Sequence, residues 1–431
     1  MKFARFFLQE NESLLEISVA KNYGNFFKIF IILCDIMSHL RQRSSKLMGV
    51  FDFNKKKLGF GLMRLPLLDE KNIANIDIEQ VKEMVDLFLA RGFTYFDTAW
   101  MYHDFKSEDA VKEALTSRHK RDKYTLASKL HFAFISTKED RDTIFNKQLE
   151  KTGVSYFDYY LLHGIEDSTY DRYLEFDCFN WLRWQKAQGL VKHIGCSCHC
   201  SADLLDRILT EHPELEFVQL QINYLDWGDK NVQSKQCYRV ATAHNVPIVV
   251  MEPLKGGTLV NLPPQAQALL DKAELRASDL ALRFVADLPN VAMVLSGMSS
   301  LEQLKMNTDI MAYPMPIEAK ERLLIRNIKH MLKDLNAIPC TNCSYCTTKC
   351  PKHIPINSFF ALYNQDIHDV SSKIPQGDGS FWKAEDVYYN QVASAHAPAG
   401  DCIKCGECEK LCPQQLPIRD LLEKVKARFG R

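Results

Sequence analysis

Short apolar segments alternate with longer amphipathic segments through most of the chain, beginning near residue 58. The short segments are continuous apolar runs, a pattern typical of strands buried on both faces. The longer segments carry apolar residues at helical spacing, and residues 78–92 and 139–153 each predict a helix that ends at a glycine. Eight strands are expected, at residues 58–61, 94–97, 124–128, 157–162, 193–197, 217–221, 247–251 and 291–296.

This alternation predicts the α/β fold class. Repeated strand–helix units over ~250 residues indicate a parallel sheet with helices on both faces. Eight such units favour a closed (β/α)8 TIM barrel. A doubly wound open sheet is the alternative, and its first strand is often followed by a GxGxxG turn. Residues 59–64, GFGLMR, contain only two of those glycines, which favours the barrel.

Length and charge limit the further possibilities. A chain of 431 residues suits one large domain and a smaller one. The 54 Lys and Arg residues balance the 54 Asp and Glu residues, so the formal net charge is zero. A nucleic-acid partner usually requires a basic excess or patch. We therefore expect no nucleic-acid binding.

The first residues form a segment of different character. Residues 25–37 are apolar but include Lys28 and Asp35. This run is shorter than the ~20 residues of a membrane span, and no small-residue cleavage site follows it. Because the residues after Met48 resemble the start of a domain, we expect residues 1–47 to lie outside the fold, residues 48–312 to form the barrel, and no membrane association.

Polar residues stand where the predicted strands end, which is the end of a barrel that carries the chemistry. These residues are Asp97, Lys129, His163, Ser197, Gln219 and Glu252, with Tyr102 on the loop after Asp97. A tyrosine can protonate a carbonyl oxygen if its pKa, ~10 when unperturbed, is lowered. A nearby ammonium would lower the tyrosine pKa, and a carboxylate would hold the ammonium. Each residue alone has a structural explanation, but the set suits carbonyl reduction by a hydride donor.

Several segments resemble the aldo-keto reductase family. They are FDTAWMYHDFKSE (96–108), LASKL (126–130), DYYLLHG (158–164), VKHIGCS (191–197) and GMSSLEQLKMN (297–307). The resemblance implies a barrel, a nicotinamide cofactor and a catalytic tetrad of Asp97, Tyr102, Lys129 and His163. In that tetrad Tyr102 would be the general acid, Lys129 and Asp97 would tune it, and His163 would orient the substrate.

The same resemblance implies a set of cofactor positions. Residues 252–257, EPLKGG, resemble the pyrophosphate-binding loop, and Met251 stands where an aromatic residue usually stacks on the nicotinamide ring. Gln303 replaces an arginine that often pairs with the 2′-phosphate, so both NADP(H) and NAD(H) stay open. The implied cofactor-binding residues are Ser197, Gln219, Pro253, Leu254, Gly256, Gly297, Ser299, Gln303 and Asn307.

Eight of the 14 cysteines form two runs near the end of the chain. Residues 340–351 and 402–413 both follow the pattern C-x2-C-x2-C-x3-C-P, the spacing of bacterial ferredoxins with [4Fe–4S] clusters. Zinc is the alternative, because CxxC pairs also bind zinc. In a chain of this length, without a convincing signal peptide, the cysteines indicate metal binding in a reducing cytoplasm and not disulfides.

In two-cluster ferredoxins the fourth cysteine of each run binds the other cluster. This predicts one cluster on Cys340, Cys343, Cys346 and Cys412, and a second on Cys402, Cys405, Cys408 and Cys350. Residues 340–431 would form this small, mainly helical, ferredoxin-like domain, and residues 313–339 a helical connector. Together the two resemblances point to an iron–sulfur aldo-keto reductase.

Another cysteine segment, CSCHC at residues 196–200, lies at the end of a predicted strand. Alternate residues of a strand share one face at ~7 Å spacing, whereas zinc needs a tetrahedral cage. We expect small packing residues near a cofactor here and not a metal site.

Three functions fit these sites. The first is an oxidoreductase acting on a small carbonyl or alcohol, whose clusters exchange electrons with a ferredoxin or flavoprotein partner. In the second, the barrel works alone as a carbonyl reductase and the clusters are structural or sensory. In the third, the barrel is inactive and the protein transfers electrons or senses redox state. Coupling a two-electron hydride to one-electron clusters usually needs a flavin, and the sequence contains no flavin fingerprint.

Overall fold

The computed structural model describes residues 49–430, apart from residues 54, 70, 71, 231, 335–336, 368–372, 376–380, 384–388, 391, 394 and 395. The predicted extension, residues 1–47, lies outside the described residues.

Eight parallel strands close into a barrel in which each strand pairs with its sequence neighbours and β1 pairs with β8. The closed order confirms the predicted TIM barrel and excludes the open sheet. Every expected strand is present, within a few residues of its predicted limits. The strands are β1 (Leu58–Gly61), β2 (Tyr95–Asp97), β3 (Thr125–Leu130), β4 (Phe157–Ile165), β5 (Val191–Cys198), β6 (Phe217–Gln221), β7 (Ile248–Met251) and β8 (Val291–Gly297).

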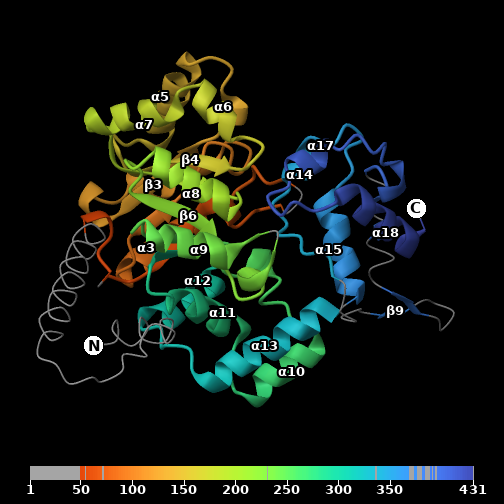
Figure 1. Cartoon of the computed structure of the whole chain (residues 1–431). Helices are drawn as coiled ribbons and strands as arrows, with labels where there is room; N and C mark the ends of the chain where they lie inside the picture. Colours follow the sequence, from red (N-terminus) through yellow and green to blue (C-terminus); the bar gives the residue numbers. More distant parts are fainter. Residues whose placement is uncertain are drawn as a thin grey trace, which may run out of the picture.

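Helices surround the barrel (Figure 1). At the start of α3 the Asp77 side chain accepts a hydrogen bond from the Gln80 amide, and α5 ends at Gly153, which has a positive φ of 68°. The helices are α3 (Ile78–Ala90), α4 (Ser107–Val111) with a π-helical turn at Lys112–Thr116, α5 (Glu139–Thr152), α6 (Tyr170–Glu175), α7 (Cys178–Ala187), α8 (Ala202–Glu211), α9 (Ser234–Ala243), α10 (Pro264–Lys272), α11 (Ala277–Ala286) and α12 (Leu301–Ala312).

Aromatic residues fill the end of the barrel at which the strands begin. Phe51 stacks on Tyr159 with ring centroids 4.9 Å apart, and it meets the edge of Phe217 at 5.6 Å. Tyr159 and Phe217 lie at or near the first residues of β4 and β6. The opposite end, where the strands finish, is therefore the end left for polar side chains.

Beyond the barrel the chain forms one further helix that packs on the barrel, and from Ile338 onward it forms a second, mainly helical body with its own core. Helix α13 (Ala319–Asp334) packs against α10 through Ile325, Ile328 and Leu332. The second core centres on Phe359, Phe360 and neighbouring residues. Its elements are α14 (Tyr345–Thr348), α15 (Ile356–Ile367), β9 (Lys373–Pro375), β10 (Phe381–Lys383), α17 (Glu407–Lys410) and α18 (Ile418–Phe429).

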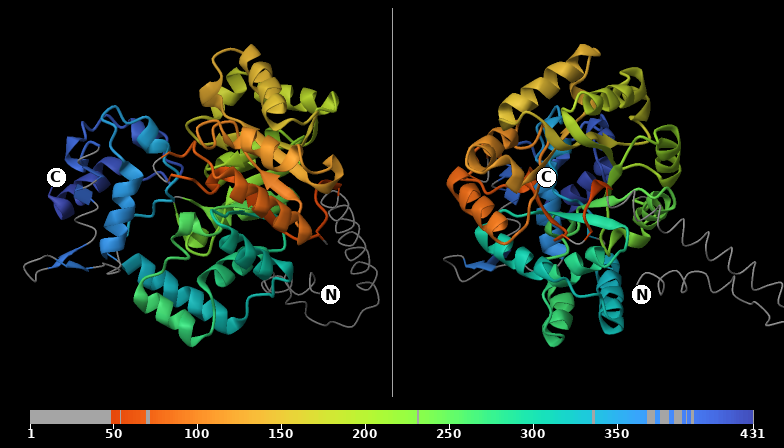
Figure 2. Two further views of the ribbon diagram at one scale, coloured as in Figure 1. Left: turned by 180° about the vertical axis from the view of Figure 1, so that it is seen from behind. Right: turned by 90° about the vertical axis from the view of Figure 1, so that its left-hand side faces the viewer.

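This C-terminal body lies across the end of the barrel where the strands finish. In the right-hand view of Figure 2 it lies behind the barrel, within the ring of helices. Arg64, just after β1, donates a hydrogen bond to the Thr341 carbonyl at 2.7 Å, and Gln221, the last residue of β6, bonds to Gln414.

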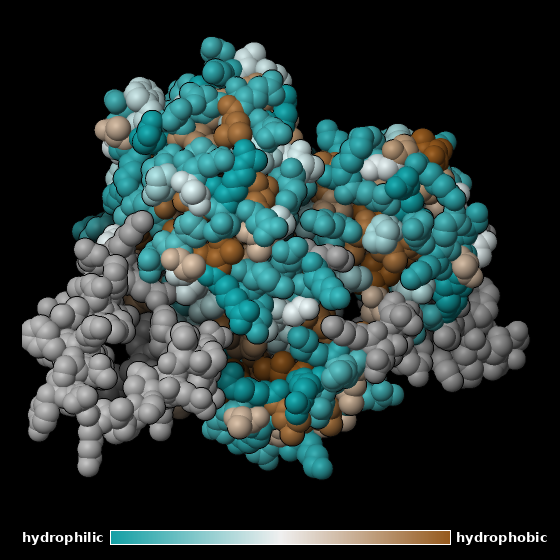
Figure 3. Space-filling view, in the orientation of Figure 1, coloured by the Kyte–Doolittle hydropathy of each residue, from teal (hydrophilic) through white to brown (hydrophobic). Residues whose placement is uncertain are grey.

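The surface shown in Figure 3 is mostly hydrophilic, with hydrophobic residues in small separate patches. Among the described residues, no helix is long and apolar enough to cross a membrane.

Candidate functional site

The four predicted tetrad residues converge at the covered end of the barrel. The Lys129 ammonium, from β3, donates hydrogen bonds to Asp97 Oδ1 at 2.5 Å, to the Thr98 carbonyl at 2.8 Å and to the Tyr102 hydroxyl at 3.4 Å. The His163 ring, from β4, stands at 80° to the Tyr102 ring with centroids 5.7 Å apart. All four side chains are buried. The arrangement thus places a proton-bearing hydroxyl beside an ammonium and an imidazole.

The expected lowering of the Tyr102 pKa is wrong for this structure. Burial raises the pKa of Tyr102, the negative charges of Asp97 and Glu252 raise it further, and the Arg64 guanidinium acts in the opposite direction. Burial also raises the pKa of Asp97 and lowers the pKa of Lys129, and the attraction between the two charges opposes both shifts. The carboxylate therefore offsets the ammonium, and the sequence could not reveal how deeply the pair is buried.

His163 is held in its neutral form. Burial lowers its pKa well below the usual value, and the nearby Lys129, His131 and His199 add to the shift. Its Nδ1 atom has no hydrogen-bond partner in the described part of the chain.

Other buried polar atoms in the same region also lack a partner among the described residues. They are Asp97 Oδ2, Gln219 Oε1 and Asn307 Oδ1. A buried polar group without a hydrogen bond costs about 1–3 kcal/mol. These atoms therefore fit a site that a polar ligand completes.

A cleft of about 330 Å³ runs from Asp97 and Tyr102 along the strand ends to α12. Met251 lies in its wall, where the resemblance suggested a stacking ring. Eight of the nine predicted cofactor positions line the cleft: Gln219, Pro253, Leu254, Gly256, Gly297, Ser299, Gln303 and Asn307. The ninth, Ser197, lies outside its walls, and the hydroxyl of Ser197 accepts a hydrogen bond from the Gly164 amide at 2.7 Å.

The eight cysteines of the two runs gather around two cavities in the C-terminal body. Cys340, Cys343, Cys346 and Cys412 line the first cavity, here called the cluster-1 site. Cys350, Cys402, Cys405 and Cys408 line the second, here called the cluster-2 site. Each set takes three cysteines from one run and the fourth from the other, as the ferredoxin spacing suggests.

The chemistry of these donors fits iron–sulfur clusters. Burial raises the pKa of the Cys343 thiol to about 12, so its thiolate form requires a cation beside it. Within the described chain, no group of three or more His, Cys, Asp or Glu side chains is arranged to hold a single metal ion. Four thiols around a cavity suit a cluster, because each thiolate binds a different iron atom.

The CSCHC segment has the buried character expected of packing residues. Cys196 Sγ and Cys198 Sγ lie 3.5 Å apart, and the Cys237 thiol donates to the Cys200 carbonyl at 3.6 Å. Hydrogen bonds from Cys196 and Cys200, together with burial, raise the pKa of Cys198.

Comparison with known proteins decides the family. A model of the aldo/keto reductase family matches residues 57–324, more than half of the chain. The chain belongs to the aldo/keto reductase family. A model of a 4Fe-4S dicluster domain matches residues 339–417, which contain all eight cysteines of the two runs.

Individual relatives of this aldo/keto reductase are distant. The uncharacterized oxidoreductase YqkF of Bacillus subtilis is 23% identical over 60% of this chain and 88% of its own length. The aldo-keto reductase AKR11C1 of Bacillus halodurans is 24% identical, with a TM-score of 0.51, over 63% of this chain and 91% of its own. An aldo-keto reductase of Klebsiella pneumoniae in complex with NADPH is 17% identical, with a TM-score of 0.51, over 63% of this chain and 90% of its own. These likenesses show the barrel fold.

Sequence reasoning missed Arg64 in this site. Arg64 lines the cleft, bonds to Thr341, and lies 3.6 Å from the Glu252 carboxylate. Its position three residues after the first strand was the available signal, because residues that follow strands line the working end of a barrel.

The loop formed by residues 252–257 has an unusual backbone. Glu252 and Lys255 have positive φ angles of 55° and 47°, which cost non-glycine residues on the order of 1–3 kcal/mol. Gly256 also has a positive φ, and a Cβ there would lie 2.2 Å from the Thr341 carbonyl oxygen. This loop therefore keeps its shape only while its surroundings hold it.

Proposed function

We propose that this reductase uses a nicotinamide nucleotide to reduce an aldehyde or ketone, or to oxidise the corresponding alcohol, and that two [4Fe–4S] clusters transfer single electrons. The observation that carries the proposal is the buried Asp97–Lys129–Tyr102 arrangement with His163 beside it. The cleft lined by Asp97 and Tyr102 supports it, and so does the NADPH bound by the Klebsiella relative.

In this proposal each tetrad residue has one task. A bound nicotinamide would supply the hydride. Tyr102 donates its proton to the substrate oxygen. Its raised pKa makes this hydroxyl a weak acid in the described chain, so the proton transfer depends on groups that stabilise the phenolate. Lys129, held by Asp97, stabilises the negative charge left on Tyr102. Neutral His163 hydrogen-bonds the carbonyl oxygen and orients it.

The nucleotide would lie along the cleft. Gln219, whose carbonyl oxygen lacks a partner, would accept a hydrogen bond from the nicotinamide carboxamide, and loop 252–257 would face the pyrophosphate. Ser299 and Asn307 would hold the adenosine end, with Gln303 beside them. Gln303 already accepts a hydrogen bond from the Ser299 amide at 2.8 Å, and its neutral amide cannot form a charge-assisted pair with a 2′-phosphate. Both NADH and NADPH are therefore tested.

The cluster-1 and cluster-2 sites would hold the two [4Fe–4S] clusters, whose role is to carry electrons to or from a ferredoxin or flavoprotein. Such clusters fit a reducing cytoplasm. The domain limits follow the same proposal, with the barrel at 48–312, the connector at 313–339 and the cluster domain at 340–431.

One anaerobic experiment tests the proposal. The protein is purified under argon, its iron is counted, and oxidation of NADH and of NADPH is followed with a panel of aldehydes and ketones. The proposal expects about eight irons per chain and turnover with at least one nucleotide. Turnover that is unchanged in a Tyr102→Phe variant would contradict the tetrad and favour an electron-transfer or redox-sensing protein with an inactive barrel.

Cluster absorption is then recorded after each nucleotide is added, with and without a flavin. Bleaching by nucleotide alone would connect barrel and clusters in one electron path. Intact clusters that never bleach would leave the barrel as an independent reductase.

A further inference from the structure

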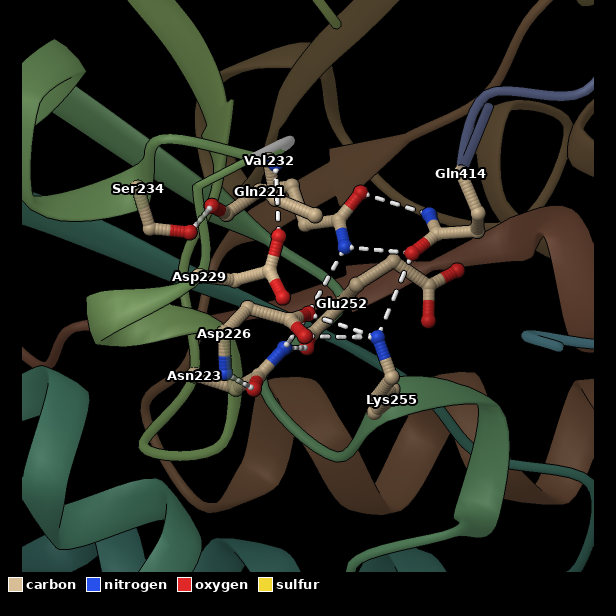
Figure 4. A network of polar contacts seen from close by, with 9 residues as sticks. All are labelled: Gln221, Asn223, Asp226, Asp229, Val232, Ser234, Glu252, Lys255 and Gln414. Atoms are coloured by element: carbon tan, nitrogen blue, oxygen red, sulfur yellow. Dashed lines mark hydrogen bonds and ion pairs between the residues drawn. The ribbon is translucent and has the colours of Figure 1, made fainter. Parts of the chain in front are cut away.

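A buried network of polar side chains joins the cluster domain to the barrel (Figure 4). Gln221 and Gln414 exchange two hydrogen bonds: Gln221 Nε2 donates to Gln414 Oε1 at 2.8 Å, and Gln414 Nε2 donates to Gln221 Oε1 at 2.7 Å. Gln221 Nε2 also donates to Asp226 Oδ2 at 2.8 Å. Gln414 follows Cys412 of the cluster-1 site by two residues, so the network begins at the backbone that carries this cysteine.

The network continues into loop 252–257. The Lys255 ammonium, which is only 1% exposed, donates to both Asp226 oxygens at 2.7 and 2.8 Å and to Gln414 Oε1 at 3.2 Å. Asn223 Nδ2 donates to Asp226 Oδ2 at 2.7 Å and to the Glu252 carbonyl at 3.1 Å. The side chain of Lys255 is thus fixed by one residue of the cluster domain and one residue of the barrel.

A second segment of the cluster-1 site holds the same loop from another side. Thr341 lies between Cys340 and Cys343, and its carbonyl oxygen packs against the Cα of Gly256 and accepts the bond from Arg64. Loop 252–257 is therefore held by residues next to Cys340 and next to Cys412. A cluster bound to both cysteines would fix the distance between these two segments.

We propose that binding of a nucleotide in the cleft and reduction of the cluster in the cluster-1 site are thermodynamically linked through loop 252–257, with Lys255 and Gln414 as positioning residues. The inference rests on the proposed function, since it takes the cleft as the nucleotide site. Linkage of this kind is reciprocal. If reduction of the cluster changes the nucleotide affinity by a given factor, bound nucleotide changes the equilibrium constant for cluster reduction by the same factor.

Electrostatics fixes the sign of the effect. Reduction adds one negative charge at the cluster-1 site, and a pyrophosphate would bring further negative charge to loop 252–257. The Lys255 ammonium connects the two places, because it bonds to Gln414, two residues from Cys412, and belongs to the loop whose Leu254 and Gly256 line the cleft. Like charges in a buried, low-dielectric region repel. Reduction should therefore weaken nucleotide binding, and the nucleotide should make reduction of this cluster harder.

ADP-ribose is the probe, because it carries the pyrophosphate and adenosine but has no nicotinamide to react. Its affinity for the intact protein is measured anaerobically by calorimetry, once with oxidised and once with dithionite-reduced clusters. Both cluster potentials are then measured with and without saturating ADP-ribose by electron paramagnetic resonance. We expect about tenfold weaker binding to the reduced protein, and a fall of about 59 mV in one cluster potential for that tenfold factor.

The second cluster serves as an internal control, because its potential should stay unchanged. Gln414→Asn shortens the side chain that reaches both Gln221 and Lys255, and it should reduce the tenfold factor to less than threefold. Gln415→Asn makes the same change at the next, exposed residue and should leave the factor intact. Lys255→Arg keeps the charge and should retain the sign of the effect.

The linkage would be overturned if ADP-ribose bound the oxidised and the reduced protein with equal affinity. It would also be overturned if the Gln414→Asn variant kept the full tenfold difference between the two states. If carbonyl turnover with NADH or NADPH is normal in that case, the proposed function stands without it. Failure of ADP-ribose to bind in either state would overturn both the nucleotide site and the linkage.

Discussion

Gln221 and Gln414 are 193 positions apart in the sequence, yet their side-chain amides pair face to face through two hydrogen bonds. Gln221 is the last residue of β6, and Gln414 follows Cys412 of the cluster-1 site by two residues. Because a primary amide has both donors and an acceptor, two glutamines satisfy each other without adding charge to a buried interface. This pair therefore joins the segment that carries Cys412 to the end of the barrel where the strands finish.

Removing the Tyr102 hydroxyl tests the proposed general acid. Tyr102→Phe should lower kcat for carbonyl reduction by about 10²- to 10⁴-fold, the usual contribution of a positioned acid. Iron content and ADP-ribose affinity should stay unchanged. Tyr95→Phe is the matched control, since the Tyr95 hydroxyl is also buried and has no partner among the described residues. Similar loss of kcat in both variants would indicate a general packing effect.

Replacement of cysteines by serine tests the crossed arrangement, in which each cluster site takes three cysteines from one run and the fourth from the other. Cys412→Ser combined with Cys346→Ser should cost about half of the iron, because both cysteines line the cluster-1 site. Cys412→Ser combined with Cys408→Ser should cost nearly all of it, since this pair affects both sites. Iron analysis with electron paramagnetic resonance measures the outcome, and an uncrossed arrangement predicts the opposite result for the two double variants.

A substitution at Gly256 tests the close contact between loop 252–257 of the barrel and Thr341 of the cluster-1 segment. Gly256→Ala would place a Cβ 2.2 Å from the Thr341 oxygen, so the cluster-1 segment or loop 252–257 must shift. We expect ADP-ribose affinity to fall at least tenfold. Gly189→Ala is the control, because Gly189 has a similar positive φ of 74° but open space around it, and it should show only backbone strain on the order of 1–3 kcal/mol. An unchanged affinity in Gly256→Ala would show that the contact does not matter for the nucleotide.

The buried Glu108 carboxyl predicts a pH dependence of stability. Burial raises the pKa of Glu108 to about 7, while hydrogen bonds from Ser128 and Gln148 act in the opposite direction. The folded chain thus keeps a proton that the unfolded chain releases at a pKa of about 4.3. The stabilising contribution is complete below the unfolded pKa and is lost as the pH rises through about 7.

Replacement by glutamine removes this dependence. Between about pH 5.5 and pH 8, the free energy of unfolding of Glu108→Gln relative to wild type should rise by roughly 2 kcal/mol. Anaerobic denaturant titrations measure it. Glu83→Gln, at an exposed position on α3, should show no such trend. A constant difference for Glu108→Gln would mean that this carboxyl is ionised in the folded chain.

The sequence by itself determined the barrel and the family. The eight strands and the helices between them follow from periodicities that involve residues close in sequence, and local backbone preferences suffice to produce them. The segments around Asp97, Lys129 and His163 carried the family resemblance, and the spacing of the two cysteine runs predicted the dicluster domain. These features can be recognised in the sequence because each depends only on residues that are close together along the chain.

Only the tertiary structure decided how these parts meet. The raised pKa of Tyr102 depends on burial and on the charge of Glu252, which a linear sequence does not specify. The place of Arg64 in the cleft and the pairing of Gln221 with Gln414 depend on packing between segments hundreds of residues apart. Burial and long-range contacts arise from the whole fold at once, and for this reason the connection between barrel and clusters could be read only from the folded chain.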